Sequence, residues 1–259
     1  MGNVAPPVSS IQLEGAVDIR AQKVFVWGGV VNWLMSFGGL YIAGFLPIVS
    51  PAASAEEIAA LYRQHGPLMV EIGSILFLLA SAPFIPFIAV LSAQIKRIEG
   101  NRRTLTYLQL AAGAASMTPL VVTPLPWCVA AFRPEHSAEI VHVLNDLGFI
   151  TMLTATPAVG VQVLAVGLAV LADKRARPVF PRWVAPASFV CAIGLQGGLL
   201  LVLTQTGPFA WDGVVAGLLP FIFFPWCIVM TPVLLRAIRQ QQVEEAEVRR
   251  AVSLQFPAA

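Results

Sequence analysis

Charged residues are scarce in this chain of 259 residues. Asp, Glu, Lys and Arg make up 12% of it, whereas hydrophobic residues make up 57% and the mean hydropathy is +0.77. A water-soluble domain of this length needs a far larger polar surface. The composition therefore excludes an ordinary soluble globular domain and indicates a membrane protein.

Cysteine and histidine are also rare, with three residues of each. Cys128, Cys191 and Cys227 lie in or beside apolar runs and form no CxxC pair, so neither a disulfide framework nor a structural zinc site is expected. Three histidines are too few for the histidine-rich di-iron membrane desaturases and hydroxylases. HExxH, GxSxG and P-loop motifs are absent as well. The sequence does not decide whether the protein is an enzyme, and it requires no cofactor.

Six long runs without charge are present instead. They cover residues 24–55, 72–95, 104–132, 147–172, 183–211 and 213–235. Each can cross a bilayer, because a spanning helix needs about 20 apolar residues. Backbone groups find no water in hydrocarbon, so each run is predicted to be helical. The expected fold class is all-α, with a segment at 1–23, a bundle of six transmembrane helices over 24–237 and a helical tail at 238–259.

Lys and Arg are distributed unevenly over the segments that connect these runs. Fourteen of the sixteen lie on the side that carries both termini, and only Arg63 and Arg133 lie on the other side. The positive-inside rule therefore predicts that both termini face the cytoplasm. The basic inner side needs no partner beyond anionic lipid. Nothing in the sequence indicates binding to nucleic acid.

The first outer connection, SPAASAEEIAALYRQHG, has a helical pattern of its own. Ser54 and Glu57 have the spacing of a capping box. A short helix is predicted over residues 54–64 at the outer surface. It either covers a site as a lid or rests on the membrane interface, and the sequence is compatible with both.

Prolines are frequent within the apolar runs, and they occur at Pro83, Pro86, Pro119, Pro124, Pro157, Pro186, Pro220, Pro225 and Pro232. Each removes a backbone donor and can kink its helix. Four follow a threonine, namely Thr118, Thr123, Thr156 and Thr231, whose hydroxyls can bond carbonyls freed nearby. Kinked helices leave cavities, which suits a bundle that encloses a ligand. Asn32, Gln162 and Gln196 are expected to form hydrogen bonds between helices.

The stretch RPEHSAEIVHVLND, residues 133–146, concentrates ionisable groups before the fourth run. On a helix Glu139, His142 and Asp146 share an arc of about 60°. Imidazole and carboxylate groups suit acid–base chemistry, and they also suit Zn, Cu or Fe. The candidate residues are Asp146 and Glu71 for catalysis; Asn145, His142, Glu139, His65, Trp127 and Trp211 for ligand binding; and His142, Asp146, Glu139 and His136 for a transition metal. Trp127 and Trp211 are also expected in an aromatic belt at the outer interface.

A simpler interpretation of these polar residues is that they are solvated side chains at the point where a helix leaves the lipid. Three functions remain open beside it. The first is an outward-facing polar pocket that binds or acts on a small hydrophobic or lipid-like molecule. The second is a transporter for a small solute or cation. The third is an accessory protein whose small-residue motifs, such as Gly39-x-x-x-Ala43, pack against a membrane partner subunit or a second copy.

Three groups of motifs occur in order along most of the chain: GFLPIVSPAASAEEIAALYRQH, then VAAFRPEH with LNDLGF, then PVFPRW with TGPFAWDG. Together they resemble a group of multi-pass membrane proteins common in actinobacteria, for which no activity is established. The resemblance implies the same architecture and a bacterial inner-membrane location. It implies no mechanism, and it assigns no role to His65, Glu71, His136 or His142.

Overall fold

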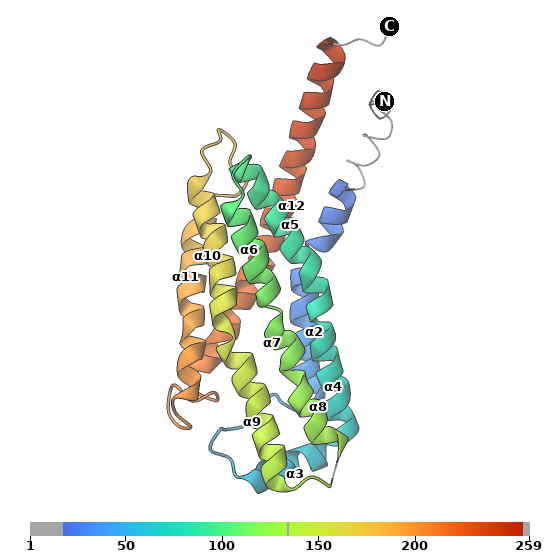
Figure 1. Ribbon diagram of the computed structural model, residues 1–259, viewed down its shortest axis with the longest axis vertical. Helices are drawn as coiled ribbons and strands as arrows, with labels where there is room; N and C mark the ends of the chain where they lie inside the picture. The colour runs from blue at the N-terminus through green and yellow to red at the C-terminus, as the bar shows by residue number, and fades with distance from the viewer. Residues whose placement is uncertain (1–17, 134, 256–259) are drawn as a thin grey trace, which may run out of the picture.

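The computed structural model describes residues 18–133 and 135–255, and the elements in these ranges are all helical (Figure 1). They are α2 (Gly28–Ile42), α3 (Ala55–His65), α4 (Pro67–Leu79), α5 (Ser81–Glu99), α6 (Thr104–Ala115), α7 (Thr118–Val122), α8 (Pro124–Phe132), α9 (Ala138–Thr154), α10 (Thr156–Ala172), α11 (Val184–Leu195), the 3₁₀ helix η1 (Gln196–Val202) and α12 (Val214–Gln255). The expected all-α class is confirmed.

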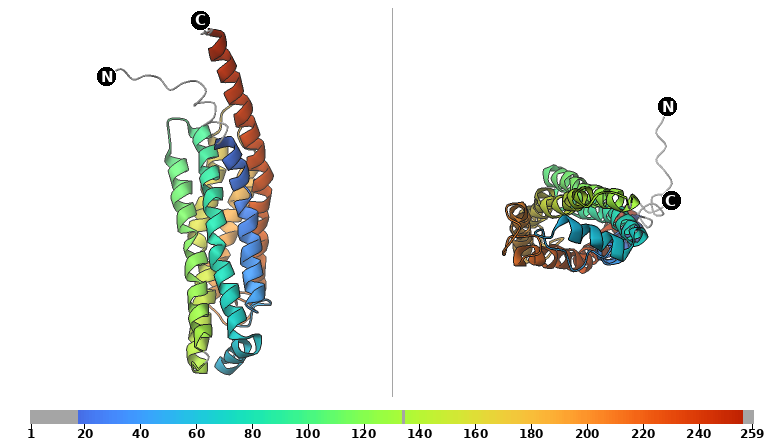
Figure 2. Two further views of the ribbon diagram at one scale, coloured as in Figure 1. Left: turned by 90° about the vertical axis from the view of Figure 1, so that its right-hand side faces the viewer. Right: turned by 90° about the horizontal axis from the view of Figure 1, so that it is seen from below.

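Among the described residues, six helical stretches are long and apolar enough to cross a membrane, so the protein is an integral multi-pass membrane protein. They are Asp18–Ile42, Pro67–Glu99, Thr104–Phe132, Ala138–Ala172, Val184–Val202 and Val214–Gln255. The stretches lie side by side in an elongated bundle (Figure 2). Its first and last described residues lie at one end, called here the termini end, and α3 lies across the other, called the α3 end (Figure 1).

Five of the six stretches are interrupted partway along their length, and the first of them, Asp18–Ile42, has a turn at Val26 and Trp27 before α2 begins. α4 and α5 meet at Ala80, Ser116 and Met117 separate α6 from α7, α9 and α10 meet at Ala155, and α11 changes to η1 at Gln196. At the α4–α5, α6–α7 and α9–α10 junctions a proline lies within the first three residues of the next helix. Proline lacks the N–H that would bond back across the junction and is tolerated in a first turn, so these sites start new helices.

Threonine–proline pairs behave in two ways. Thr118–Pro119, Thr123–Pro124 and Thr156–Pro157 stand where α7, α8 and α10 begin, whereas Thr231–Pro232 lies inside α12. The hydroxyl of Thr231 donates to the Cys227 carbonyl at 3.2 Å, so the predicted use of these hydroxyls is confirmed there. It is wrong for Thr123 and Thr156, whose buried hydroxyls have no hydrogen-bond partner among the described residues.

Close contact between α2 and α4 depends on two glycines. A Cβ on Gly39 would lie 2.6 Å from the carbonyl oxygen of Gly73, and a Cβ on Gly73 would lie 2.4 Å from the backbone nitrogen of Ala43. Side chains at these positions would therefore push the helices apart. The Gly39-x-x-x-Ala43 motif thus packs two helices of the same chain against each other.

An aromatic core fills the α3 end of the bundle. Trp127 is fully buried, and its ring centroid lies 4.7 Å from that of Phe45 and 5.1 Å from that of Phe149. Phe149 also stacks on the buried Trp211 at 5.8 Å. The aromatic-belt prediction is therefore wrong for Trp127 and Trp211, because neighbouring rings cover both instead of lipid headgroups.

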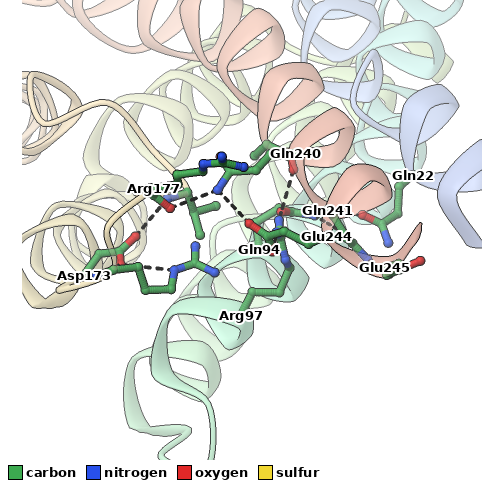
Figure 3. Close-up of polar contacts among 12 residues, drawn as sticks. Gln22, Gln94, Arg97, Asp173, Arg177, Gln240, Gln241, Glu244 and Glu245 are labelled. Carbon is green, nitrogen blue, oxygen red and sulfur yellow. Dashed lines mark hydrogen bonds and ion pairs between the residues drawn. The ribbon is translucent and has the colours of Figure 1, made fainter. Parts of the chain in front are cut away.

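At the termini end, polar side chains join three spans (Figure 3). The fully buried Gln94 of α5 donates from Nε2 to Gln22 and Gln241, each at 2.9 Å. Arg97, one turn further along α5, donates to the Ala237 carbonyl at 3.0 Å and to the Glu244 carboxylate at 2.8 Å. These bonds fasten α12 to α5 where α12 leaves the bundle.

The connection between α10 and α11 is held by a buried carboxylate. Asp173 accepts hydrogen bonds from the backbone N–H of Val179 at 2.8 Å and from Arg175 Nε at 3.2 Å. Arg182 donates to the carbonyls of Val170 and Asp173. Backbone carbonyls at the end of α10 thus gain partners, which fixes how α11 returns into the bundle.

Candidate functional site

The interrupted helices surround a cavity of about 220 Å³ inside the bundle. Every span supplies part of its wall, and the cavity is partly open to the outside. The junction residues Ser116, Met117 and Ala155 belong to the wall, and Leu195 borders it beside the start of η1. Broken helices in membrane proteins commonly form binding sites in this way, because their ends leave room and free backbone groups.

The wall is almost entirely apolar. Five phenylalanines contribute to it, namely Phe37, Phe77, Phe84, Phe223 and Phe224. Phe37 and Phe224 meet edge to face with ring centroids 5.1 Å apart. Met117 and Met152 add flexible side chains that adapt to irregular shapes. None of the described residues of the wall is Asp, Glu, Lys, Arg or His, so the cavity offers no partner for an ion.

Four polar side chains interrupt this apolar wall, and two of them have partners. Asn32 is buried and donates to the Ala80 carbonyl at 2.9 Å, at the junction of α4 and α5. Ser116 donates to the Gly113 carbonyl at 2.6 Å and lies 3.1 Å from Gln162 Oε1. Both side chains therefore support helix junctions as well as lining the cavity.

The other two polar groups of the wall are hydroxyls without partners. Ser36 of α2 is 3% exposed and Thr156 at the start of α10 is 8% exposed. Neither oxygen has a hydrogen-bond partner among the described residues. Ser36 lies one helical turn after Asn32, on the buried face of α2 that also carries Gly39. The close packing of α2 against α4 thus holds Ser36 at the cavity wall.

The sequence-predicted site residues lie elsewhere, at the α3 end. His142 Nε2 and Asp146 Oδ2 are 3.5 Å apart, and both side chains are about 30% exposed. Asn145 is buried; its side-chain oxygen accepts from the Tyr62 hydroxyl at 3.3 Å, and its backbone carbonyl accepts from Trp127 Nε1 at 3.4 Å. Burial raises the pKa of Tyr62, so its hydroxyl stays protonated as the donor. Asn145 thereby joins α9 to α3 and α8.

Glu71 and His136 belong to a surface groove that His142, Asn145 and Asp146 do not line. They border an open groove of about 510 Å³ together with Cys128 and Arg133. His65 Nε2 lies 2.6 Å from the Ile42 carbonyl at the end of α2, a contact that fixes α3. Glu139 is exposed in the first turn of α9. The candidate residues thus divide into separate sites, and none of them lines the internal cavity.

The arrangement of the ionisable side chains also bears on the predicted transition-metal site. Within residues 18–133 and 135–255, no group of three or more His, Cys, Asp and Glu side chains is placed to hold a metal ion. His142 and Asp146 form a pair, whereas protein metal sites generally supply three or four ligands. The described residues thus place His142 and Asp146 side by side without a third metal-ligating side chain.

Sequence reasoning missed Ser36 entirely, along with a second polar pair. Ser92 of α5 donates to Gln109 of α6, and both are buried. The Nε2 atoms of Gln109 and Gln162 have no partner among the described residues. A polar residue inside an apolar run was the available signal. It had singled out Asn32 and Gln162, and Ser36 and Gln109 have the same feature.

Comparison with models of protein families, with curated proteins and with solved structures finds no match for this chain. The structure alone therefore establishes the architecture, which is that of a multi-pass helical membrane protein. The function has to be inferred from the cavity and the polar groups around it.

Proposed function

We propose that this protein binds a small hydrophobic or lipid-like molecule in the cavity between its six spans. The cavity itself carries the proposal. Cores of folded proteins are packed with few voids larger than a water molecule, so an apolar space of about 220 Å³ needs an explanation. An apolar cavity of about 150 Å³ is large enough to hold benzene. A somewhat larger neutral molecule, or one end of a lipid, fits the space described here.

The surrounding lipid limits what can hold such a ligand. Transfer from lipid to an apolar cavity gains little hydrophobic free energy, because lipid tails are as apolar as the wall. Affinity must therefore come from shape and from polar contacts. Phe37 and Phe224 supply a fixed aromatic surface, and Met117 and Met152 supply adaptable contacts.

The proposal includes the orientation expected from Lys and Arg, with both termini in the cytoplasm, and the bacterial inner membrane that the resemblance implies. The termini end then faces the cytoplasm and the α3 end faces outward. Asp146 and Glu71 do not line the cavity. In this proposal they act, if they bear on function, at the outer surface.

The test uses two adjacent leucines of α12. Leu219 lines the cavity and is 8% exposed, whereas Leu218 is 53% exposed and does not line it. Wild type, Leu219→Trp and Leu218→Trp are purified in mild detergent, and bound apolar molecules are extracted and identified by mass spectrometry. We expect one compound near stoichiometry in wild type and in Leu218→Trp, and its loss from Leu219→Trp. Equal content in all three proteins would contradict the proposal.

Transport is a second candidate, favoured by the polar pairs toward the termini end. Gln109 and Gln162 keep unpaired amide nitrogens there, between the cavity and the loop that precedes α6. Water or a small solute passing through the bundle would need such donors. Transport predicts solute or proton flux in vesicles that Gln162→Leu abolishes, whereas a binding protein gives no flux.

A further inference from the structure

Three aromatic rings meet at the interface between α2 and α12, two helices that lie side by side (Figure 2). The ring of Phe37 on α2 meets that of Phe224 on α12 edge to face, with centroids 5.1 Å apart. Trp33, one turn before Phe37, contacts both rings, with centroids 5.6 and 6.2 Å from its own. Phe37 and Phe224 line the cavity, whereas Trp33 does not. Trp33 thus covers the two cavity-lining rings from outside the cavity.

On α2 the rings lie at the border between the buried and the exposed face. Each residue of a helix is rotated by about 100° from the one before, so Trp33 and Phe37 lie about 100° and 140° from Asn32. Asn32 is 3% exposed and lines the cavity, whereas Leu34, about 200° from Asn32, is 57% exposed. The exposed apolar face of a membrane span contacts lipid. The rings therefore lie between the cavity and the lipid.

Phe224 has the equivalent place on α12. It lies three residues after Phe221, which is 76% exposed, and three residues before Cys227, which is 1% exposed. Pro220 and Pro225 lie close to it in the sequence, one on either side. Each proline lacks the N–H that would bond to the carbonyl four residues earlier. Beside this ring α12 therefore lacks two backbone hydrogen bonds, and it bends here at less cost than in an uninterrupted stretch.

The contact of α2 with α12 differs from its contacts with α4 and α5. Backbones approach so closely at Gly39 and Gly73 of the α2–α4 contact, and at Gly28 against Pro83 of α5, that a Cβ would collide there. Among the described residues, no hydrogen bond joins Gly28–Ile42 to α12. Separating α2 from α12 at the rings therefore breaks aromatic contacts and no polar bond, while α2 stays packed on α4 and α5.

We infer that the α2–α12 interface is a lateral entrance, through which the ligand passes between the lipid and the cavity when Trp33, Phe37 and Phe224 separate. Closed, the same rings complete the cavity wall. This inference rests on the proposed binding function and specifies the source of the ligand, which is dissolved in the membrane. The described wall carries no ionisable side chain, so the entrance admits uncharged molecules and disfavours ions.

The test measures exchange of a probe between lipid and cavity at equilibrium. 1-Fluoronaphthalene is added to the full-length protein in lipid nanodiscs, and ¹⁹F nuclear magnetic resonance separates the lipid-dissolved probe from the protein-bound probe. The areas of the two signals give the affinity, and saturation transfer between them gives the exchange rate. Empty nanodiscs identify the signal of the lipid-dissolved probe.

Trp33→Leu removes two ring contacts outside the cavity, so we expect exchange to become roughly tenfold faster. The bound fraction should stay the same, because an easier opening accelerates entry and exit equally, and this also shows that the cavity remains folded. Tyr41→Leu removes an exposed ring of the same helix that does not line the cavity, and it should change neither quantity. An exchange rate in Trp33→Leu equal to that of wild type would overturn the inference.

A bridge across the interface should have the opposite effect. In Phe37→Cys combined with Phe224→Cys, a bifunctional methanethiosulfonate links the two helices, whereas a monofunctional one modifies the same cysteines without linking them. We expect exchange in the linked protein to be at least about tenfold slower than in the unlinked one, because the entrance stays closed, and dithiothreitol should restore it. Wild type treated with the bifunctional reagent should keep its rate. Equal rates in linked and unlinked protein would contradict the entrance.

The two proposals fail in different ways. If Leu219→Trp abolishes the bound signal but Trp33→Leu and the bridge leave the exchange rate unchanged, the cavity binds its ligand and the entrance lies elsewhere. If wild type gives no signal beyond that of empty nanodiscs, the cavity does not act as a binding site and both proposals fall.

Discussion

Asn32 on α2 donates a 2.9 Å hydrogen bond to the carbonyl of Ala80, where α4 ends and α5 begins. The bond links residues 48 positions apart in the chain and is buried. It gives a partner to a backbone oxygen at a helix junction that lipid could not satisfy. Because Asn32 also lines the cavity, this bond connects the break in one span to the shape of the site.

Replacing Asn32 with leucine keeps the side-chain volume and removes the donor. We expect Asn32→Leu to destabilise the protein by about 1 kcal/mol, the usual size of a hydrogen bond between transmembrane helices. Thermal unfolding in detergent measures the effect. Leu34→Ala, on the exposed face of the same helix, is the control and should lower the melting temperature much less. An unchanged melting temperature in Asn32→Leu would show that the junction does not need this bond.

Arg97 should control how firmly α12 is held at the termini end. Its guanidinium bonds the Ala237 carbonyl and the Glu244 carboxylate, so Arg97→Met removes both contacts. Hydrogen exchange of residues 238–246 should become roughly fivefold faster, a modest effect because the ion pair is partly exposed. Lys96→Met, at the exposed neighbouring position, should leave exchange unchanged. Equal exchange in both variants would refute the fastening role.

The pair His142 and Asp146 makes a prediction about metal content. Two ligands at 3.5 Å from each other do not build a three- or four-coordinate site. Elemental analysis of the purified protein should therefore give no stoichiometric Zn, Cu or Fe, with the same result for Asp146→Asn. Stoichiometric metal in wild type that is lost in Asp146→Asn would reinstate a metal centre at the α3 end.

The start of α3 predicts a pH dependence. Ser54 Oγ accepts from the Glu57 N–H, while Glu57 accepts from the Ser54 N–H, which completes the predicted capping box. Hydrogen bonds from Ser54 lower the pKa of Glu57 below its usual 4.5. A lowered folded-state pKa means that the stabilisation is present above pH 4.5 and is lost as the pH falls through the lowered value.

Amide exchange at the start of α3, corrected for the intrinsic effect of pH, should therefore accelerate in acid. Glu57→Gln should remove this pH dependence, whereas Glu56→Gln should retain it. Ser54→Ala should accelerate exchange about fivefold at neutral pH, the usual effect of losing an N-cap. Exchange that does not respond to acid would contradict the assignment.

The six spans could be predicted because hydrophobic length and the absence of charge are local properties of sequence. Prolines within the runs indicated possible kinks, and α5, α7, α8 and α10 each have a proline among their first three residues. The contacts that build the site could not be predicted from the sequence, because the partner of Asn32 is a backbone carbonyl, a group that every residue carries. Trp127 was assigned to the interface because its position in the run is visible in sequence, whereas its packing on Phe45 and Phe149 is not.

The candidate site shows the same limit. Asp146, His142 and Glu71 were predicted as site residues because ionisable groups beside apolar runs are easily recognised in a sequence. Ser36 and Thr156 lie 120 positions apart in the sequence, and each alone is an ordinary small polar residue. Their shared cavity depends on how the broken spans pack, which no local pattern encodes.

A density map of the wild-type protein in lipid nanodiscs, from electron cryomicroscopy at side-chain resolution, tests the central claim most directly. The account predicts non-protein density in the cavity that contacts Phe223 and Phe224. A cavity closed by collapsed side chains, or one that stays empty, would contradict it.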